Sequence, residues 1–169
     1  MKLGSFEVRG IETGRFRLDG GAMFGVVPKV LWEKTDPADE NNRIAMTMRV
    51  LYAERDGMRL IVDSGAGDKL GEKMLRNYEI ESPPLRERLL EEGIDPDGVT
   101  HAVMTHLHFD HAGGFTWRDG DGSLRLAFPN AVHFVQRRQW RAALEPNEKD
   151  RASFFPENFL PLEERGRLR

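Results

Sequence analysis

Residues 106–111 hold a dense group of side chains that can bind a metal ion. His106, His108, Asp110 and His111 lie within six positions, in the order His-x-His-x-Asp-His. Imidazole nitrogens and carboxylate oxygens are the donors that proteins offer to zinc, iron and manganese. Three of the five histidines of the chain fall in this run, so an ordinary polar loop is a poor explanation of it. The sequence therefore predicts a transition-metal site at these residues.

The local sequence can bring these side chains together. His106 and His108 end a predicted strand over 99–105, and alternation along an extended segment puts both imidazoles on one side. Asp110 and His111 lie in the turn that follows, and the glycine pair after them lets the backbone pass closely or adopt positive φ. This arrangement allows two neighbouring ions, one held by His106 and His108 and the other by Asp110 and His111.

The elements that must position the cluster are strands first and then strands mixed with helices, which predicts an α+β arrangement of layers. Alternating polarity predicts strands over 6–9 and 14–19, and a hairpin over 45–62 that turns at Asp56-Gly57 with type I′ chemistry. The segment 22–32 is apolar without clear periodicity, and Pro28 makes it a poor central strand.

The second half of the chain changes to helical spacing in places. Pro84 and Gly93 bracket a predicted helix over 84–92, since proline fits the first turn and glycine the residue after the last. The other elements that we expect are a surface loop over 35–43, a hairpin over 117–128, a strand over 131–135, a helix over 136–144, and a short helix or ordered loop over 150–160.

Composition limits the classes of function. The net charge of −3 offers no basic surface for nucleic acid or for an anionic membrane. The absence of cysteine excludes disulfides and thiolate metal sites. We see no signal-peptide pattern at the start and no apolar stretch of transmembrane length, so we expect a soluble, cytoplasmic protein that acts on a small molecule.

Two runs resemble one known family. The run from His106 to Gly114 resembles the signature of the metallo-β-lactamase superfamily, and the run from Leu60 to Gly67, with Asp63 at a strand end, resembles its earlier motif. A narrower resemblance, to the branch of lactonase-like and organophosphate-hydrolase-like enzymes, is carried by Gly21–Gly25, Val99–Thr105, Phe128–Ala131, Gln136–Trp140 and Pro146–Ser153.

The resemblance implies a fold and a set of roles. It implies an αββα sandwich with the metals at one edge of two sheets, His106 and His108 on the first ion, and Asp110 and His111 on the second. Two divalent ions are implied, zinc first, with iron, manganese or cobalt as alternatives. It also implies a metal-bound hydroxide as nucleophile, Asp110 as the catalytic residue beside it, and Asp63 as a supporting residue that holds the histidine loop by hydrogen bonds.

The chain departs from the family pattern after His111. Family members continue into a second half that supplies a third histidine for the first ion, a bridging Asp and a last histidine for the second. Here the one later histidine is His133, which we expect to be a half-buried strand residue. Two ligands for each ion is fewer than the three of a catalytic zinc.

We therefore expect residues 1–169 to be the N-terminal half of a single metallo-β-lactamase-like domain. A truncation, proteolysis, or a domain formed by two polypeptides would each explain the missing ligands. A C-terminal half or a second chain would then supply them, and a homo-oligomer is a further possibility. Alone, the chain should bind metal poorly and be inactive.

The leading functional interpretation is a metal-dependent hydrolase of a lactone or ester, with an N-acyl homoserine lactone as the sharper hypothesis. The alternatives are a phosphotriesterase or phosphodiesterase on the same di-metal centre, and a non-catalytic half-domain that associates with a partner chain. An exposed apolar sheet face would support the last of these. Met23 and Phe24 either pack ordinarily or form a hydrophobic wall of a substrate pocket.

Overall fold

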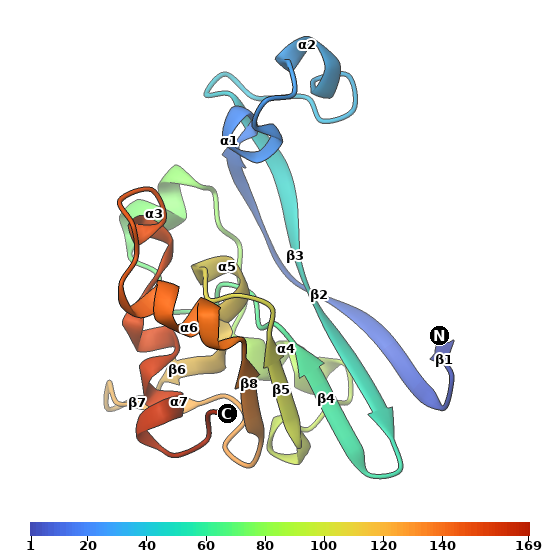
Figure 1. The fold of residues 1–169 in the computed structure, drawn as a ribbon. Helices are drawn as coiled ribbons and strands as arrows, with labels where there is room; N and C mark the ends of the chain where they lie inside the picture. Colours follow the sequence, from blue (N-terminus) through green and yellow to red (C-terminus); the bar gives the residue numbers. More distant parts are fainter.

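The computed structural model describes residues 1–169, and Figure 1 shows one large sheet with short helices around it. The strands are β1 (Lys2–Leu3), β2 (Phe6–Asp19), β3 (Arg43–Arg55), β4 (Met58–Val62), β5 (His101–Met104), β6 (Thr116–Arg118), β7 (Leu124–Leu126) and β8 (Val132–Val135). The helices are α1 (Gly20–Phe24), α2 (Lys29–Trp32), α3 (Glu72–Asn77), α4 (Leu85–Glu91), α5 (Phe109–Ala112), α6 (Arg137–Leu144) and α7 (Leu160–Glu164). Four 3₁₀ turns complete the chain: η1 (Pro96–Gly98), η2 (Gly113–Phe115), η3 (Arg151–Ser153) and η4 (Pro156–Asn158).

The main sheet has six strands in the order β1-β2-β3-β4-β5-β8. Neighbours are antiparallel as far as β4, and β4, β5 and β8 are parallel to one another. The turn between β3 and β4 has positive φ at both Asp56 (49°) and Gly57 (83°), which confirms the predicted type I′ turn. Strands β6 and β7 form a separate small hairpin, as the sequence predicts.

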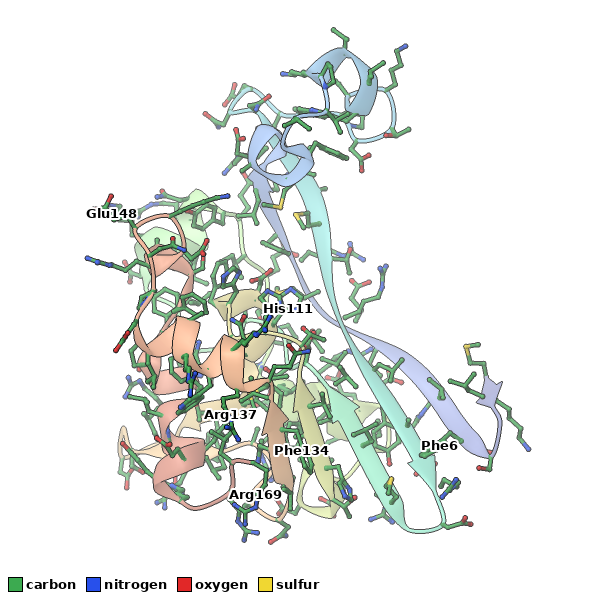
Figure 2. The ribbon with its side chains drawn as sticks, in the orientation of Figure 1. Phe6, His111, Phe134, Arg137, Glu148 and Arg169 are labelled. Atoms are coloured by element: carbon green, nitrogen blue, oxygen red, sulfur yellow. The ribbon has the colours of Figure 1, made fainter.

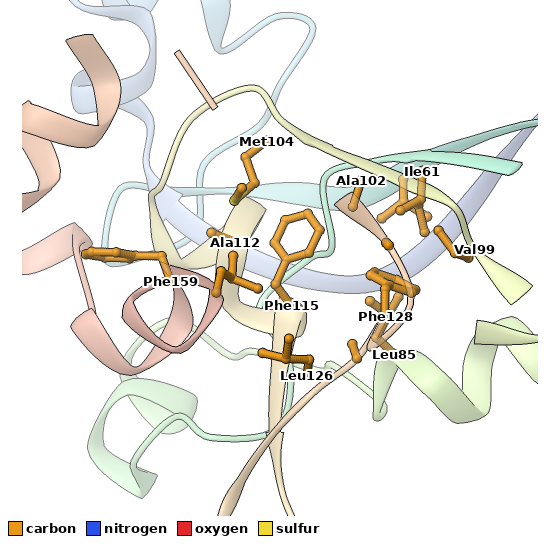
Figure 3. Close-up of a cluster of buried hydrophobic side chains, with 14 of the residues drawn as sticks. Ile61, Leu85, Val99, Ala102, Met104, Ala112, Phe115, Leu126, Phe128 and Phe159 are labelled. Carbon is orange, nitrogen blue, oxygen red and sulfur yellow. The ribbon is translucent and has the colours of Figure 1, made fainter. Parts of the chain in front are cut away.

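One face of the sheet carries the hydrophobic core. Ile61, Ala102 and Met104 point into a cluster that includes Leu85 and Leu89 of α4 and the aromatic rings of Phe115 and Phe128, as Figure 3 shows for most of these side chains. The apolar spacing of α4 thus serves to cover the sheet, and a layer of helices and turns lies on this face alone.

The opposite face of the sheet is apolar and open. Cross-strand pairing places Leu51 beside Val62, Val62 beside Val103, and Val103 beside Phe134, in one row across four strands. Leu51 is 42% exposed and Phe134 38%. We call this row, with Leu60 and Val132 next to it, the open sheet face. One sheet with helices on one side agrees with the predicted α+β class and corresponds to one half of the predicted αββα sandwich.

Several local predictions were wrong. The two strands expected over 6–9 and 14–19 are one strand, β2, because an irregularity between Glu12 and Gly14 lets the pairing with β3 continue. The expectation that the segment 22–32 is a poor central strand is confirmed: it holds the last residues of α1 and all of α2, at the far end of the long β2–β3 ribbon (Figure 1). Helix α3 was not expected, since it buries no residue and so leaves no periodic signal.

No helix of the chain has the length and apolar content needed to cross a membrane.

Candidate metal centre

The candidate ligands lie where two parallel strands end. Asp63 follows β4, and Thr105 and His106 follow β5. Because β4 and β5 are parallel neighbours, their carboxyl ends meet at the same edge of the sheet. Asp110 and His111 then come from the single turn of α5, which begins right after His108, and His111 is labelled beside it in Figure 2.

The structure brings together the four residues that the sequence singles out. His106, Asp110 and His111 each offer one ligand atom, and these atoms lie within 4.8 Å of one another. The His108 ring lies beside them, with its centroid 4.7 Å from that of His106. All four residues are half-buried. The donor set and its spacing fit a divalent transition-metal ion.

The grouping in the structure differs from the expected pairs. The three close ligand atoms come from His106 of the first pair and from Asp110 and His111 of the second. The His106 and His111 ring centroids are 4.0 Å apart, closer than those of His106 and His108. The division of the four residues between two ions therefore stays a prediction.

Asp63 is the hydrogen-bond acceptor behind the cluster. Its Oδ1 accepts the Thr105 backbone N–H at 2.8 Å, and its carboxylate also accepts the Thr105 hydroxyl, at 2.9 Å for Oδ1 and 2.8 Å for Oδ2. The Nδ1–H of His111 donates to Oδ2 at 2.8 Å. Asp63 is nearly buried, so these bonds lie in a region of low dielectric, where they fix geometry strongly.

These bonds orient two imidazoles. Since a carboxylate only accepts, Nδ1 of His111 carries a proton, and Nε2 faces Asp110 in the cluster. The Thr105 hydroxyl, which donates to Asp63, lies 3.1 Å from Nδ1 of His106 and can accept its proton. Thr105 was not predicted as a site residue. The signal that could have found it is its position directly before His106, in a run already assigned to the site.

The electrostatics of the cluster follow from burial and from mutual contact. Burial acts against the His111 cation, but hydrogen bonds to Asp110 and Asp63 outweigh it and raise the pKa of His111 to about 9. Burial raises the pKa of Asp110, and the contact with His111, 3.4 Å from its Oδ2 to Nε2, more than offsets this, so that the pKa is lowered. Burial, followed by the charges of His111 and His108, lowers the pKa of His106.

Glycines let two backbone segments touch behind the cluster. A Cβ on Gly67, which has φ of 67°, would lie 2.6 Å from the Gly113 carbonyl oxygen. A Cβ on Gly113 would overlap the Ala66 carbonyl. The Ser64 backbone N–H and hydroxyl both donate to the His111 carbonyl, at 2.7 Å and 2.8 Å. The turn after β4 is therefore packed directly onto the ligand-bearing segment.

Met23 and Phe24 lie on α1, at the far end of the β2–β3 ribbon. Phe24 stacks on Trp32 with ring centroids 5.1 Å apart, and Met23 is 44% exposed. The contacts of α1 are with β2 and α2 rather than with the histidine cluster. The substrate-wall role of these two residues stays a prediction, and within this chain the structure does not bring them to the metal residues.

The two other histidines lie outside the cluster. The His101 ring accepts or donates a hydrogen bond with the Thr100 hydroxyl at 2.7 Å and stacks on Phe134, in keeping with a structural role. The expectation of a half-buried His133 was wrong. Its side chain is fully buried against Phe115 and Phe128, because β8, the last strand of the sheet, is covered at its outer edge by the C-terminal residues, which bridge His133 to Leu168.

Comparison with protein families gives one match. Residues 50–119 match the model of the metallo-beta-lactamase superfamily. Among curated proteins, the N-acyl homoserine lactonase AttM of Azorhizobium caulinodans is 42% identical over 55 residues, which are 32% of this chain and 17% of that protein. The N-acyl homoserine lactonase AiiA of Bacillus thuringiensis subsp. kurstaki is 38% identical over 64 residues, 38% of this chain and 22% of AiiA.

Solved structures extend the likeness over nearly the whole chain. A probable metal-dependent hydrolase from Staphylococcus aureus superposes with a TM-score of 0.84 at 36% identity, covering 94% of this chain and 56% of the other. AidC, described as a dizinc quorum-quenching lactonase, has the same fold at 19% identity, with a TM-score of 0.69 over 100% of this chain and 59% of AidC. The chain thus spans little more than half the length of these proteins.

Proposed function

We propose that this chain, which carries part of the metallo-β-lactamase superfamily fold in its lactonase-like form, supplies the first ligands of a metal-dependent hydrolase of lactones or esters. The observation that carries the proposal is the approach of His106, Asp110 and His111 within 4.8 Å, at the carboxyl ends of β4 and β5. Relatives that match the chain over this region are hydrolases, and several are described as N-acyl homoserine lactonases.

The residues that would hold the metal are His106, His108, Asp110 and His111. These four donors, together with further donors from outside this chain, suit two divalent ions. Zinc is the first choice of metal, and iron, manganese and cobalt are the alternatives. When bound, such ions lower the pKa of water to near neutrality and polarise the scissile carbonyl. Donors that are half-buried suit this task, because low dielectric strengthens the attraction for a cation.

The chain's own residues would prepare the site. Asp63 and Thr105 engage Nδ1 of His111 and of His106, which leaves Nε2 of each ring as the ligand atom, and His111 would release its Nε2 proton when an ion binds. Asp110 has two carboxylate oxygens, so one can bind an ion while the other accepts a proton or orients the nucleophile. We assign the catalytic role within this chain to Asp110 for that reason. Its pKa, lowered by His111, keeps the carboxylate ionised at neutral pH.

The site would be completed by residues outside these 169. Four donors are too few for two catalytic ions, and the open sheet face is the surface that a second sheet would cover. We infer that a C-terminal half or a second chain packs there and supplies the remaining ligands. The chain alone would then be inactive. A non-catalytic half-domain remains the competing proposal, favoured by the same open face.

The substrate that we propose is an N-acyl homoserine lactone. The support is that several relatives, matched over 55 to 64 residues of this chain, are named as N-acyl homoserine lactonases. Met23 and Phe24 would contact the acyl chain if the ribbon end reached the completed site. Turnover of N-hexanoyl homoserine lactone against a phosphotriester by the completed domain separates this proposal from its phosphotriesterase alternative.

Metal content tests the assignment of the ligands. Native mass spectrometry of the purified protein gives the bound ions and any second polypeptide in one spectrum. Replacing both His106 and His108 by Ala should remove most of the bound metal and the activity of the completed domain. Replacing His101 by Ala, which lies outside the cluster, should leave both unchanged. Unchanged metal content in the double variant would refute the proposed site.

A further inference from the structure

Lys69 is a half-buried cation next to the ligand segment. It lies two residues after Gly67, in the turn that is packed onto Gly113 and Gly114. Its Nζ donates hydrogen bonds to the carbonyl oxygens of Gly113 and Thr116. Burial lowers the pKa of Lys69 to about 8, while the charges of Asp68 and Glu157 raise it, so the amine is mostly protonated at neutral pH. A buried ammonium without hydrogen bonds would be costly, and these two carbonyls are its partners.

The two carbonyls belong to the residue that caps the ligand helix and to the first residue of β6. Helix α5 has four residues, and its last N–H groups bond back to Phe109 and His108. One helical turn has little stability of its own and needs partners for its free carbonyls. Ser64 satisfies the carbonyl of His111, and Lys69 satisfies that of Gly113, the residue that caps α5. A cation at this end of a helix also opposes the negative end of the helix dipole.

We propose that Lys69 is a positioning residue that holds α5, and with it Asp110 and His111, in the geometry that binds metal. This inference rests on the proposed metal site and adds to it a residue that touches neither ion nor substrate. Lys69 acts through the backbone, whereas Asp63 acts through the histidine side chains. The two supports come from the same turn and reach the ligand segment from different sides of its chain.

The variant Lys69→Met tests this role, since Met has nearly the same shape and lacks the charge. Lys69→Met also leaves the two carbonyls without their donor, so the melting temperature of the metal-free protein is measured beside the metal affinity. We expect the Co²⁺ dissociation constant, read from the visible absorption of the bound ion, to rise about tenfold at a temperature at which wild type and variant are both fully folded. The matched control is Lys73→Met, an exposed lysine on α3. Lys69→Arg, which keeps the charge, should restore part of the affinity.

The outcomes separate this inference from the proposed function. If the completed domain binds no Co²⁺ even at millimolar concentration, both are overturned. If the wild type binds Co²⁺ and Lys69→Met binds it equally well, the site stands and the role of Lys69 is overturned.

A measurement on the wild type covers the case in which Lys69→Met does not fold. Energetic coupling is reciprocal, so an ion that depends on Lys69 must in turn stabilise the hydrogen bonds of Lys69. NMR of ¹⁵N-labelled lysine should show Lys69 ammonium protons that exchange more slowly than those of Lys73, and more slowly again after Zn²⁺ is added. An exchange rate that Zn²⁺ does not change would overturn the inference.

Discussion

The Asp63 carboxylate accepts a hydrogen bond from the His111 imidazole, 2.8 Å from Nδ1 to Oδ2, although the two residues are 48 positions apart. Asp63 makes this contact from a left-handed backbone conformation, with φ of 61°. Asparagine is among the few residues that adopt such a backbone readily. The substitution Asp63→Asn can therefore remove the charge without disturbing the turn that presents it.

Asp63→Asn should weaken zinc binding by about 10- to 100-fold, the usual effect of losing a partner of a ligating histidine. The Asn amide has one acceptor oxygen and one donor nitrogen, so it cannot accept hydrogen bonds from both Thr105 and His111 on separate atoms. The His111 ring therefore loses its fixed orientation. Competition with a chromophoric chelator measures the affinity. Asp68→Asn, at an exposed position of the same turn, serves as the control. Equal zinc affinity in Asp63→Asn and wild type would contradict this role.

Gly113→Ala should destabilise the chain by about 1 to 3 kcal/mol, the range for an added methyl group in a tightly packed region. The backbone of Gly113 has φ of −61°, which alanine adopts freely, so the penalty comes from overlap with the Ala66 carbonyl alone. Gly120→Ala meets no atom within 4 Å and should change the free energy of unfolding by less than about 0.5 kcal/mol. Urea unfolding of both variants measures the difference, and equal stability would show that the two turns are not packed so closely.

His133 should make the fold sensitive to acid. Burial lowers its pKa from 6.5 to about 4, with the backbone near Arg167 and Ala131 acting in the opposite direction. Between pH 6.5 and 4, His133 is protonated in the unfolded chain and neutral in the folded chain. The free energy of unfolding therefore falls as the pH drops from 6.5 to 4, and His133 causes no further loss below pH 4. Over that window the loss is about 3 kcal/mol.

The variant His133→Leu isolates this effect from the carboxylates that also titrate in acid. Its free energy of unfolding should fall less steeply than that of the wild type between pH 6.5 and 4, and the two pH profiles should run in parallel above pH 7. Urea titrations at a series of pH values give both curves. Parallel profiles through the acid range would mean that His133 is protonated alike in both states.

The open sheet face should promote self-association of this chain as long as no other segment covers it. Phe134→Glu places a charge at the β8 end of the apolar row and should reduce both self-association and the binding of a hydrophobic dye. Leu90→Glu, at a 58% exposed position of α4 on the helical side, should have little effect. Sedimentation velocity of the two variants tests this. An equal reduction by both would show that association is not specific to the open sheet face.

Local chemistry made part of the fold predictable. The β3–β4 turn and α4 could be found from sequence, because they are marked by residues with strong backbone preferences of their own. These residues are Asp56 and Gly57 for the turn, and Pro84 and Gly93 for the helix. Helix α3 could not, because it buries no side chain and its hydrophobic pattern is absent. The continuity of β2 was hidden by Gly14, which resembles a strand end but sits at an irregularity in the pairing.

The candidate site was predictable in its members and not in its geometry. The run from His106 to His111 is contiguous, so its composition alone revealed it. The contacts of Asp63, Thr105 and Lys69 depend on the pairing of β4 with β5, which brings distant segments together. The burial of His133 likewise depends on strands and rings from several parts of the chain.

The parallel pairing of β4 and β5 also orders the events of folding. Parallel strands need a long crossover, which here contains α3 and α4, and contacts across such a loop form slowly. The ligands lie on one side of that crossover and their supports, Asp63 and Lys69, on the other. A nascent chain would therefore carry all four ligand residues before the crossover closes and sets their geometry, and tight metal uptake would follow only after the remaining ligands arrive.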